Sequence, residues 1–164
     1  MKITDVRAYV VNPSLPLIGS ATANPEHREW TFVEIDTDEG IAGWGECTNY
    51  PGGGSFLTAR AVLACKEALE GEDPADIERL WHKLYRRYSY LGARGLPTSA
   101  ISGIDIALWD IKGKALNRPV YDLLGGKFRT DVRLYANGWF TGCSTPQQYA
   151  RAAKDVMLKA GHTA

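Results

Sequence analysis

The chain has 164 residues, of which 45% are hydrophobic and 23% are charged, a composition typical of a globular protein and too apolar for a disordered one. The 19 Lys and Arg residues balance the 19 Asp and Glu residues, which excludes the basic surplus typical of nucleic-acid-binding proteins. No apolar run approaches the roughly 20 residues that span a bilayer, and the first residues lack the core of a signal peptide. The three cysteines are widely spaced and form no CxxC pair, so we expect reduced thiols in a cytoplasmic protein that binds neither nucleic acid nor membrane.

The N-terminal part of the sequence predicts a small antiparallel sheet. Residues 3–11 and 30–37 are rich in β-branched residues with partial alternation, and residues 41–46 form a third apolar run. Gly40 ends an Asp-Glu-Gly sequence and allows the positive φ of a tight hairpin turn between the second and third strands.

Two loops interrupt these strands. Residues 12–28 contain three prolines and no sustained period, and residues 47–54 contain three consecutive glycines. Long loops in compact domains often carry function. We therefore expect the functional residues of this part of the chain to lie in these two loops.

The middle of the chain is predicted to be helical. Ser55 is a capping residue for a helix that ends before Gly71, and Asp73 followed by Pro74 is a second start signal. The apolar residues after Pro74 recur with a helical period and define one face: Ile77, Leu80, Trp81, Leu84, Tyr85 and Tyr88.

Two more helices are expected before Gly126. One covers residues 98–116 and buries Ile101, Ile104, Leu108 and Ile111. A short one begins at Pro119 and is closed by the glycines at 125 and 126.

After Gly126 the pattern becomes that of one βα unit. Residues 132–136 predict a short strand, and Thr145 and Gln148 form a capping box around Pro146 for a helix that ends at Gly161. A single βα unit cannot cover both faces of its strand. We therefore expect a chain that is cut off, with one domain over residues 1–126 and part of another over residues 127–164.

Two segments carry a family resemblance. Residues 99–126, SAISGIDIALWDIKGKALNRPVYDLLGG, resemble the N-terminal signature of the mandelate racemase/muconate-lactonizing branch of the enolase superfamily, and residues 38–46, DEGIAGWGE, resemble its hairpin. The resemblance implies an α+β fold: a capping domain with an antiparallel β-meander followed by a helical bundle, and then the start of a truncated TIM-type (β/α) barrel. It also implies a structural role for the charged residues of the signature, Asp105, Asp110, Lys112 and Lys114.

The resemblance further implies a Mg²⁺-dependent enzyme that removes a proton α to the carboxylate of a small acid. The polar loops favour an acid-sugar dehydratase, and the resemblance implies a homo-oligomer. The alternatives are a racemase or cycloisomerase of the same superfamily, or a stand-alone binding or assembly module. The metal ligands and catalytic bases of the family lie on later barrel strands, so none is assigned within this chain. We expect the 164 residues alone to be inactive.

Four residues are candidate substrate contacts. The resemblance places Asn24, His27 and Tyr50 in the two loops that shape specificity in the family, where they would contact substrate hydroxyl or carboxylate groups; the alternative is that they are solvated loop residues. Asn137 follows the predicted barrel strand, at the face where barrel sites gather. Its amide would hydrogen-bond the substrate, unless it only forms an Asx turn.

Overall fold

The computed structural model describes residues 1–12, 29–48, 53–92, 94–136 and 138–160. They fall into two compact units, with the division between Gly126 and Lys127. The first unit combines an antiparallel sheet with helices, which is the expected α+β architecture.

The sheet has three antiparallel strands in the order β1-β2-β3: β1 (Ile3–Val11), β2 (Trp30–Thr37) and β3 (Ala42–Cys47). The predicted strands are confirmed, with the third shifted by one residue. The hairpin between β2 and β3 is confirmed as well, with Gly40 at φ 76°. Thr37 closes this turn, because its Oγ1 donates to the Ile41 carbonyl oxygen at 2.8 Å and accepts from the Ile41 backbone N–H at 3.1 Å.

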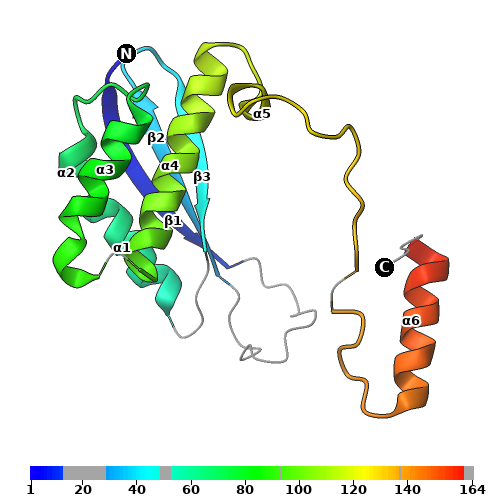
Figure 1. Ribbon diagram of the computed structural model, residues 1–164. Coiled ribbons are helices and arrows are strands. Elements are labelled where there is room, and N and C mark those ends of the chain that lie inside the picture. Colours follow the sequence, from blue (N-terminus) through cyan, green and yellow to red (C-terminus); the bar gives the residue numbers. More distant parts are fainter. Residues whose placement is uncertain (13–28, 49–52, 93, 137, 161–164) are drawn as a thin grey trace. The chain divides into compact units, whose positions relative to one another are not determined.

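Helices cover one face of this sheet (Figure 1). α4 packs along β3 and β2, while α1 packs on β1 and β2. The helical elements of the first unit are α1 (Gly54–Ala64), α2 (Lys66–Leu69), α3 (Ile77–Arg87), the 3₁₀ helix η1 (Ser89–Leu91), α4 (Leu96–Ala115) and α5 (Val120–Leu123).

Two predicted helix starts are wrong. Ser55 is not a capping residue: Gly53 occupies the N-cap position at φ 80°, and the Ser55 hydroxyl donates to the Glu29 carbonyl oxygen instead. α3 begins at Ile77 rather than at Pro74, because the Asp73 carboxylate accepts from the Ala75 backbone N–H at 2.9 Å and forms a separate turn there. The helix predicted as continuous from residue 55 to 69 is interrupted at Cys65.

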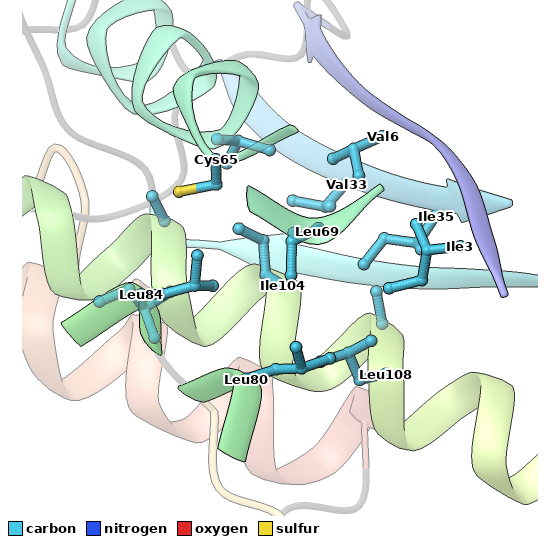
Figure 2. Packing of buried hydrophobic residues seen from close by; sticks show 14 of the residues in the cluster. Ile3, Val6, Val33, Ile35, Cys65, Leu69, Leu80, Leu84, Ile104 and Leu108 are labelled. Atoms are coloured by element: carbon cyan, nitrogen blue, oxygen red, sulfur yellow. The ribbon is translucent and has the colours of Figure 1, made fainter. Parts of the chain in front are cut away.

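The hydrophobic core lies between the sheet and the helices (Figure 2). β2 alternates strictly and turns Val33 and Ile35 inward, as a half-buried strand should. The predicted face of α3 is buried at four of its six positions, whereas Trp81 is half-buried and Tyr85 is exposed. The four residues predicted for α4 are all buried: Ile101, Ile104, Leu108 and Ile111.

The second unit contains α6 (Pro146–Ala160). The predicted capping box is confirmed, because the Gln148 side chain accepts from the Thr145 backbone N–H at 3.0 Å while the Thr145 hydroxyl accepts from the Gln148 backbone N–H at 3.3 Å. The strand predicted over residues 132–136 is wrong, since these residues have no regular secondary structure. A strand needs a neighbour for its backbone hydrogen bonds, and no described strand pairs with this segment.

The three cysteines are free, as predicted. Cys47 and Cys65 are buried in the core, and burial raises the pKa of the Cys47 thiol to about 11. In the part of the chain that the structure describes, no helix is long and apolar enough to cross a membrane.

Candidate functional site

Both predicted functional loops leave the sheet at the same end, which we call the loop end and define by Val11, Trp30 and Cys47 (Figure 1). Val11 is the last residue of β1 and pairs with Trp30, the first residue of β2. Cys47 ends β3 and pairs with Thr31 of β2. The antiparallel order of the strands therefore brings the flanks of both loops together, although they are separated in sequence.

Three side-chain hydroxyls, which we call the hydroxyl anchors, hold the backbone at the loop end. Thr31 Oγ1 donates to the carbonyl oxygen of Ser55 at 3.1 Å, and Ser55 Oγ donates to the carbonyl oxygen of Glu29 at 3.3 Å. Ser99 Oγ, near the start of α4, donates to the carbonyl oxygen of Thr48 at 3.3 Å. All three anchor residues are buried; the bond from Thr31 is buried, and the bonds from Ser55 and Ser99 are partly buried. The backbone is thereby held at Glu29, which follows the first loop, and at Thr48 and Ser55 near the two ends of the second loop.

The predicted contact residues Asn24, His27, Tyr50 and Asn137 all lie outside the described residues, and their roles stay predictions. The hydroxyl anchors were not among the residues predicted from the sequence. A signal for one of them was available, because Thr31 stands in the buried series of β2 that continues with Val33 and Ile35. A hydroxyl at such a position needs a hydrogen-bond partner.

Large apolar side chains are exposed on the segments next to the loop end. Phe56 and Leu57 in the first turns of α1 are 56% and 59% exposed. Tyr90 and Leu91 in η1, just before α4, are 102% and 76% exposed.

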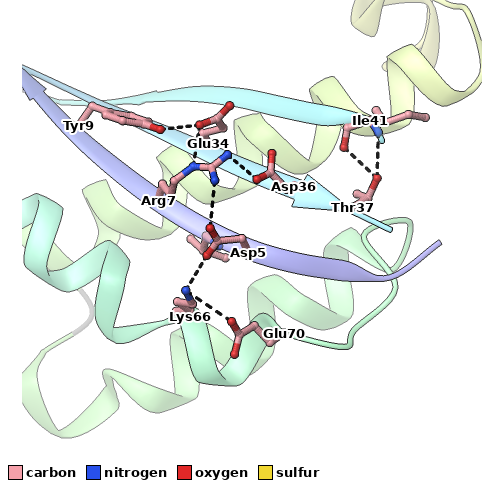
Figure 3. A network of polar contacts seen from close by, with 10 residues as sticks. Asp5, Arg7, Tyr9, Glu34, Asp36, Thr37, Ile41, Lys66 and Glu70 are labelled. Carbon is pink, nitrogen blue, oxygen red and sulfur yellow. Dashed lines mark hydrogen bonds and ion pairs between the residues drawn. The ribbon is translucent and has the colours of Figure 1, made fainter. Parts of the chain in front are cut away.

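The face of the sheet opposite α1 and α4 carries a network of ion pairs (Figure 3). Arg7 Nε donates to Glu34 at 2.9 Å, and the same guanidinium group also pairs with Asp5 and Asp36. Hydrogen bonds from Tyr9 and Arg7 lower the pKa of Glu34. A hydrogen bond from Lys66, at 2.5 Å, lowers the pKa of Asp5. These charges are held in fixed pairs, which is a structural role.

The signature residues divide into two groups. Asp110 accepts from the Trp44 backbone N–H at 2.8 Å and from Lys114 at 2.7 Å, and Lys114 also donates to the Ala42 carbonyl oxygen. These bonds fit the structural role expected for Asp110 and Lys114. Asp105, by contrast, has no hydrogen-bond or ion-pair partner among the described residues, and burial alone raises its pKa.

The described residues offer no metal centre. Among them, no group of three or more His, Cys, Asp or Glu side chains is placed to hold a metal ion. Asp5, Glu34 and Asp110 are engaged in ion pairs, and Asp105 belongs to no such group. These residues therefore do not fit a bound Mg²⁺.

Comparisons with known proteins agree with the fold. The model of the family described as "Mandelate racemase / muconate lactonizing enzyme, N-terminal domain" matches residues 3–125. D-galactarolactone cycloisomerase from Agrobacterium fabrum is 43% identical over 141 residues, which are 85% of this chain and 36% of that protein. D-galactonate dehydratase from Variovorax paradoxus is 44% identical over 142 residues, 87% of this chain and 32% of that protein. The solved structure of a member of the enolase superfamily from Salmonella Typhimurium matches with a TM-score of 0.78 and 34% identity, over 96% of this chain and 40% of that chain. The chain thus spans about a third of the length of the curated relatives that it matches.

Proposed function

Because the chain belongs to the mandelate racemase/muconate lactonizing enzyme N-terminal domain family, we propose that it forms the substrate-covering part of an enzyme that acts on acid sugars. The observation that carries the proposal is the loop end, where the antiparallel sheet brings the flanks of two polar loops together and buried hydroxyls hold them. The proposed substrate class follows the activities for which the two relatives are named, a galactonate dehydratase and a galactarolactone cycloisomerase.

Dehydration of an aldonate or aldarate is the first candidate reaction. Cycloisomerisation is the second, and it is favoured by the 43% identity to the galactarolactone cycloisomerase. Both reactions act on a polyhydroxy acid, so a lid for either substrate would present hydrogen-bonding side chains. In our proposal Asn24, His27 and Tyr50 supply these contacts and Asn137 adds an amide.

The proton α to a carboxylate is weakly acidic, and its removal needs positive charge near the developing enediolate. We propose that Mg²⁺ supplies this charge in the whole enzyme and is held by residues on later barrel strands, as the family resemblance implies. The described residues of this chain do not fit the ion. The role of the residues in this chain would be to bind substrate hydroxyls, orient the acid and exclude water. The 164 residues alone would then turn over no acid sugar.

A chimera tests the proposed function. Residues 1–126 of this chain replace the matching residues of the D-galactonate dehydratase from Variovorax paradoxus, and in a second chimera those of the D-galactarolactone cycloisomerase from Agrobacterium fabrum. We expect the first chimera to dehydrate D-galactonate with Mg²⁺ present. If the second chimera is the active one, cycloisomerisation replaces dehydration as the candidate reaction.

The control chimera takes residues 1–12, 29–48 and 53–126 from this chain and keeps the host's own sequence in the two loops. If the control is active and the full chimera turns over no acid sugar, the loops of this chain serve another substrate and the proposal is wrong. If both chimeras fold and both are inactive, the capping role itself is contradicted.

A further inference from the structure

A pocket of about 690 Å³ lies between α3 and α4, away from the sheet. Its walls include the aromatic rings of Trp81 and Trp109, one from each helix, and Asp105 contributes a carboxylate. The family signature contains Asp105 and Trp109, and neither the hydrogen bonds of the fold nor the proposed function uses the carboxylate.

Asp105 carries a charge that the described residues do not compensate. Its carboxylate is half-buried, and its pKa is raised by burial with no hydrogen bond or nearby cation to oppose the effect. Lys112, two helical turns further along α4, lies about 10 Å away along the axis. Its ammonium group sits over the Trp109 ring, at 5.3 Å from the centroid.

The other charged groups of the pocket come from α3 and its N-cap. Arg79 is occupied, since it pairs with Glu72 at 2.6 Å and with Asp76 at 3.0 Å. Glu78 and His82 are exposed at the rim. Among the described residues that line the pocket, the half-buried carboxylate left to a ligand is therefore that of Asp105, and the rings of Trp81 and Trp109 line the same pocket.

We propose that this pocket binds a guanidinium group, which donates hydrogen bonds to Asp105 and lies flat against a tryptophan wall. A planar guanidinium fits this combination better than an ammonium group does, because it binds a carboxylate through two parallel N–H bonds and stacks on aromatic rings. The position of Lys112 over Trp109 shows that a cation is accepted on one of these rings.

A guanidinium group can come from a small molecule or from an arginine side chain of a polypeptide. The pocket sees the same chemistry in both cases. The two sources are separated by comparing agmatine, a free guanidinium compound, with the capped peptide acetyl-Gly-Arg-Gly-amide.

Binding is measured on the full 164-residue chain labelled with ¹⁵N, by following the indole N–H signals of Trp81 and Trp109 during a titration with ethylguanidinium. We expect both signals to shift and to saturate. Butylammonium should bind more weakly and the neutral ethylurea should have no effect. Equal shifts with butylammonium, or none with ethylguanidinium, would overturn the proposal.

Two substitutions move the affinity in opposite directions. Asp105→Asn keeps the shape of the side chain and removes its charge, and we expect it to weaken binding about tenfold or more. Lys112→Gln removes a competing positive charge and should tighten binding. Glu67→Gln removes one negative charge from exposed surface on α2 and should leave the affinity within about twofold. If Asp105→Asn unfolds the chain, Lys112→Gln still tests the proposal. Unchanged or weaker binding of ethylguanidinium to Lys112→Gln contradicts it.

Agmatine and the peptide then identify the source. Tighter binding of the peptide assigns the pocket to a polypeptide arginine, and tighter binding of agmatine assigns it to a small molecule. If neither agmatine nor the peptide binds, and ethylguanidinium shifts neither indole signal, the pocket is not a guanidinium site.

Discussion

Gly45 of β3 lies directly against Gly103 of α4, so closely that a Cβ atom on Gly45 would overlap the Gly103 carbonyl oxygen. One turn further along α4, a Cβ on Gly43 would overlap the carbonyl oxygen of Ala107 in the same way. Strand and helix therefore pack backbone to backbone, which only glycine permits. This close contact holds the end of β3 beside the first half of α4.

Gly45→Ala should destabilise the first unit by at least about 2 kcal/mol, because the new methyl group meets backbone atoms that cannot move aside. Urea unfolding followed by circular dichroism measures the loss. The control is Glu46→Ala, next along the strand and exposed, for which we expect a change within about 0.5 kcal/mol. Equal stability of Gly45→Ala and the parent chain would contradict the packing described above.

Asp110→Ala should cost about 1–2 kcal/mol, because the carboxylate satisfies the Trp44 backbone N–H on β3, an edge strand. Hydrogen exchange measures the effect residue by residue, and the Trp44 amide should exchange faster in the variant. Asp122→Ala in α5, whose carboxylate faces Arg118, is the matched control. Unchanged protection of the Trp44 amide would show that its hydrogen bond to Asp110 does not contribute to the stability of the strand.

Glu72→Gln should remove a contribution to stability that depends on pH. Hydrogen bonds from Arg79 first, and Lys83 second, lower the pKa of Glu72 to about 2, from an ordinary value near 4.5. A carboxyl group whose pKa is lower in the folded state stabilises the fold above its unfolded pKa, and this contribution is lost as the pH falls from 4.5 toward 2. The urea midpoint of the parent chain should therefore exceed that of Glu72→Gln at pH 7 and approach it near pH 2.5.

The difference at pH 7 should be small and sensitive to salt, since the Arg79 and Lys83 side chains are half exposed. Glu67→Gln, which alters an exposed carboxylate on α2, serves as the control and should change the urea midpoint at pH 7 little. If the difference in urea midpoint between the parent chain and Glu72→Gln grows as the pH falls, the prediction is wrong.

Self-association should follow from the exposed apolar residues of the second unit. Val132, Leu134 and Tyr135 are 72%, 67% and 70% exposed, and Leu158 of α6 is 73% exposed. We expect oligomers or aggregates by size-exclusion chromatography with light scattering, and less of them in the double variant Leu134→Ser, Leu158→Ser. Arg151→Ser with Lys154→Ser is the control on the same helix. A clean monomer that binds a ligand would instead favour the stand-alone module.

Loop substitutions in the active chimera should raise KM more than they lower kcat, because the proposed contacts bind substrate and take no part in proton transfer. Asn24→Ala, His27→Gln and Tyr50→Phe should each lower kcat/KM about three- to tenfold, the value of one neutral hydrogen bond. His82→Gln alters an exposed histidine on α3 and should leave both constants unchanged. If all three loop variants keep the kcat and KM of the parent chimera, these side chains are solvated and do not contact the substrate.

The sequence predicted what depends on local pattern. Alternation predicted β2, the helical period predicted the buried face of α3, and Gly40 predicted the hairpin. The capping box at Thr145 was found for the same reason, since its partner is only three residues away. Ser55 was misassigned because its hydroxyl has a tertiary partner, Glu29, which no local pattern reveals.

The sequence alone determined the strands, the main helices and the family resemblance, because these depend on spacing along the chain. Only the tertiary structure decided that Asp110 and Lys114 support an edge strand while Asp105, in the same signature, faces a pocket and has no partner among the described residues. The physical reason is that a carboxylate acquires its role from the groups that folding brings to it, and these come from other segments of the chain. For residues 132–136 the local pattern predicted a strand, but strand structure depends on a neighbour, which the described residues do not provide.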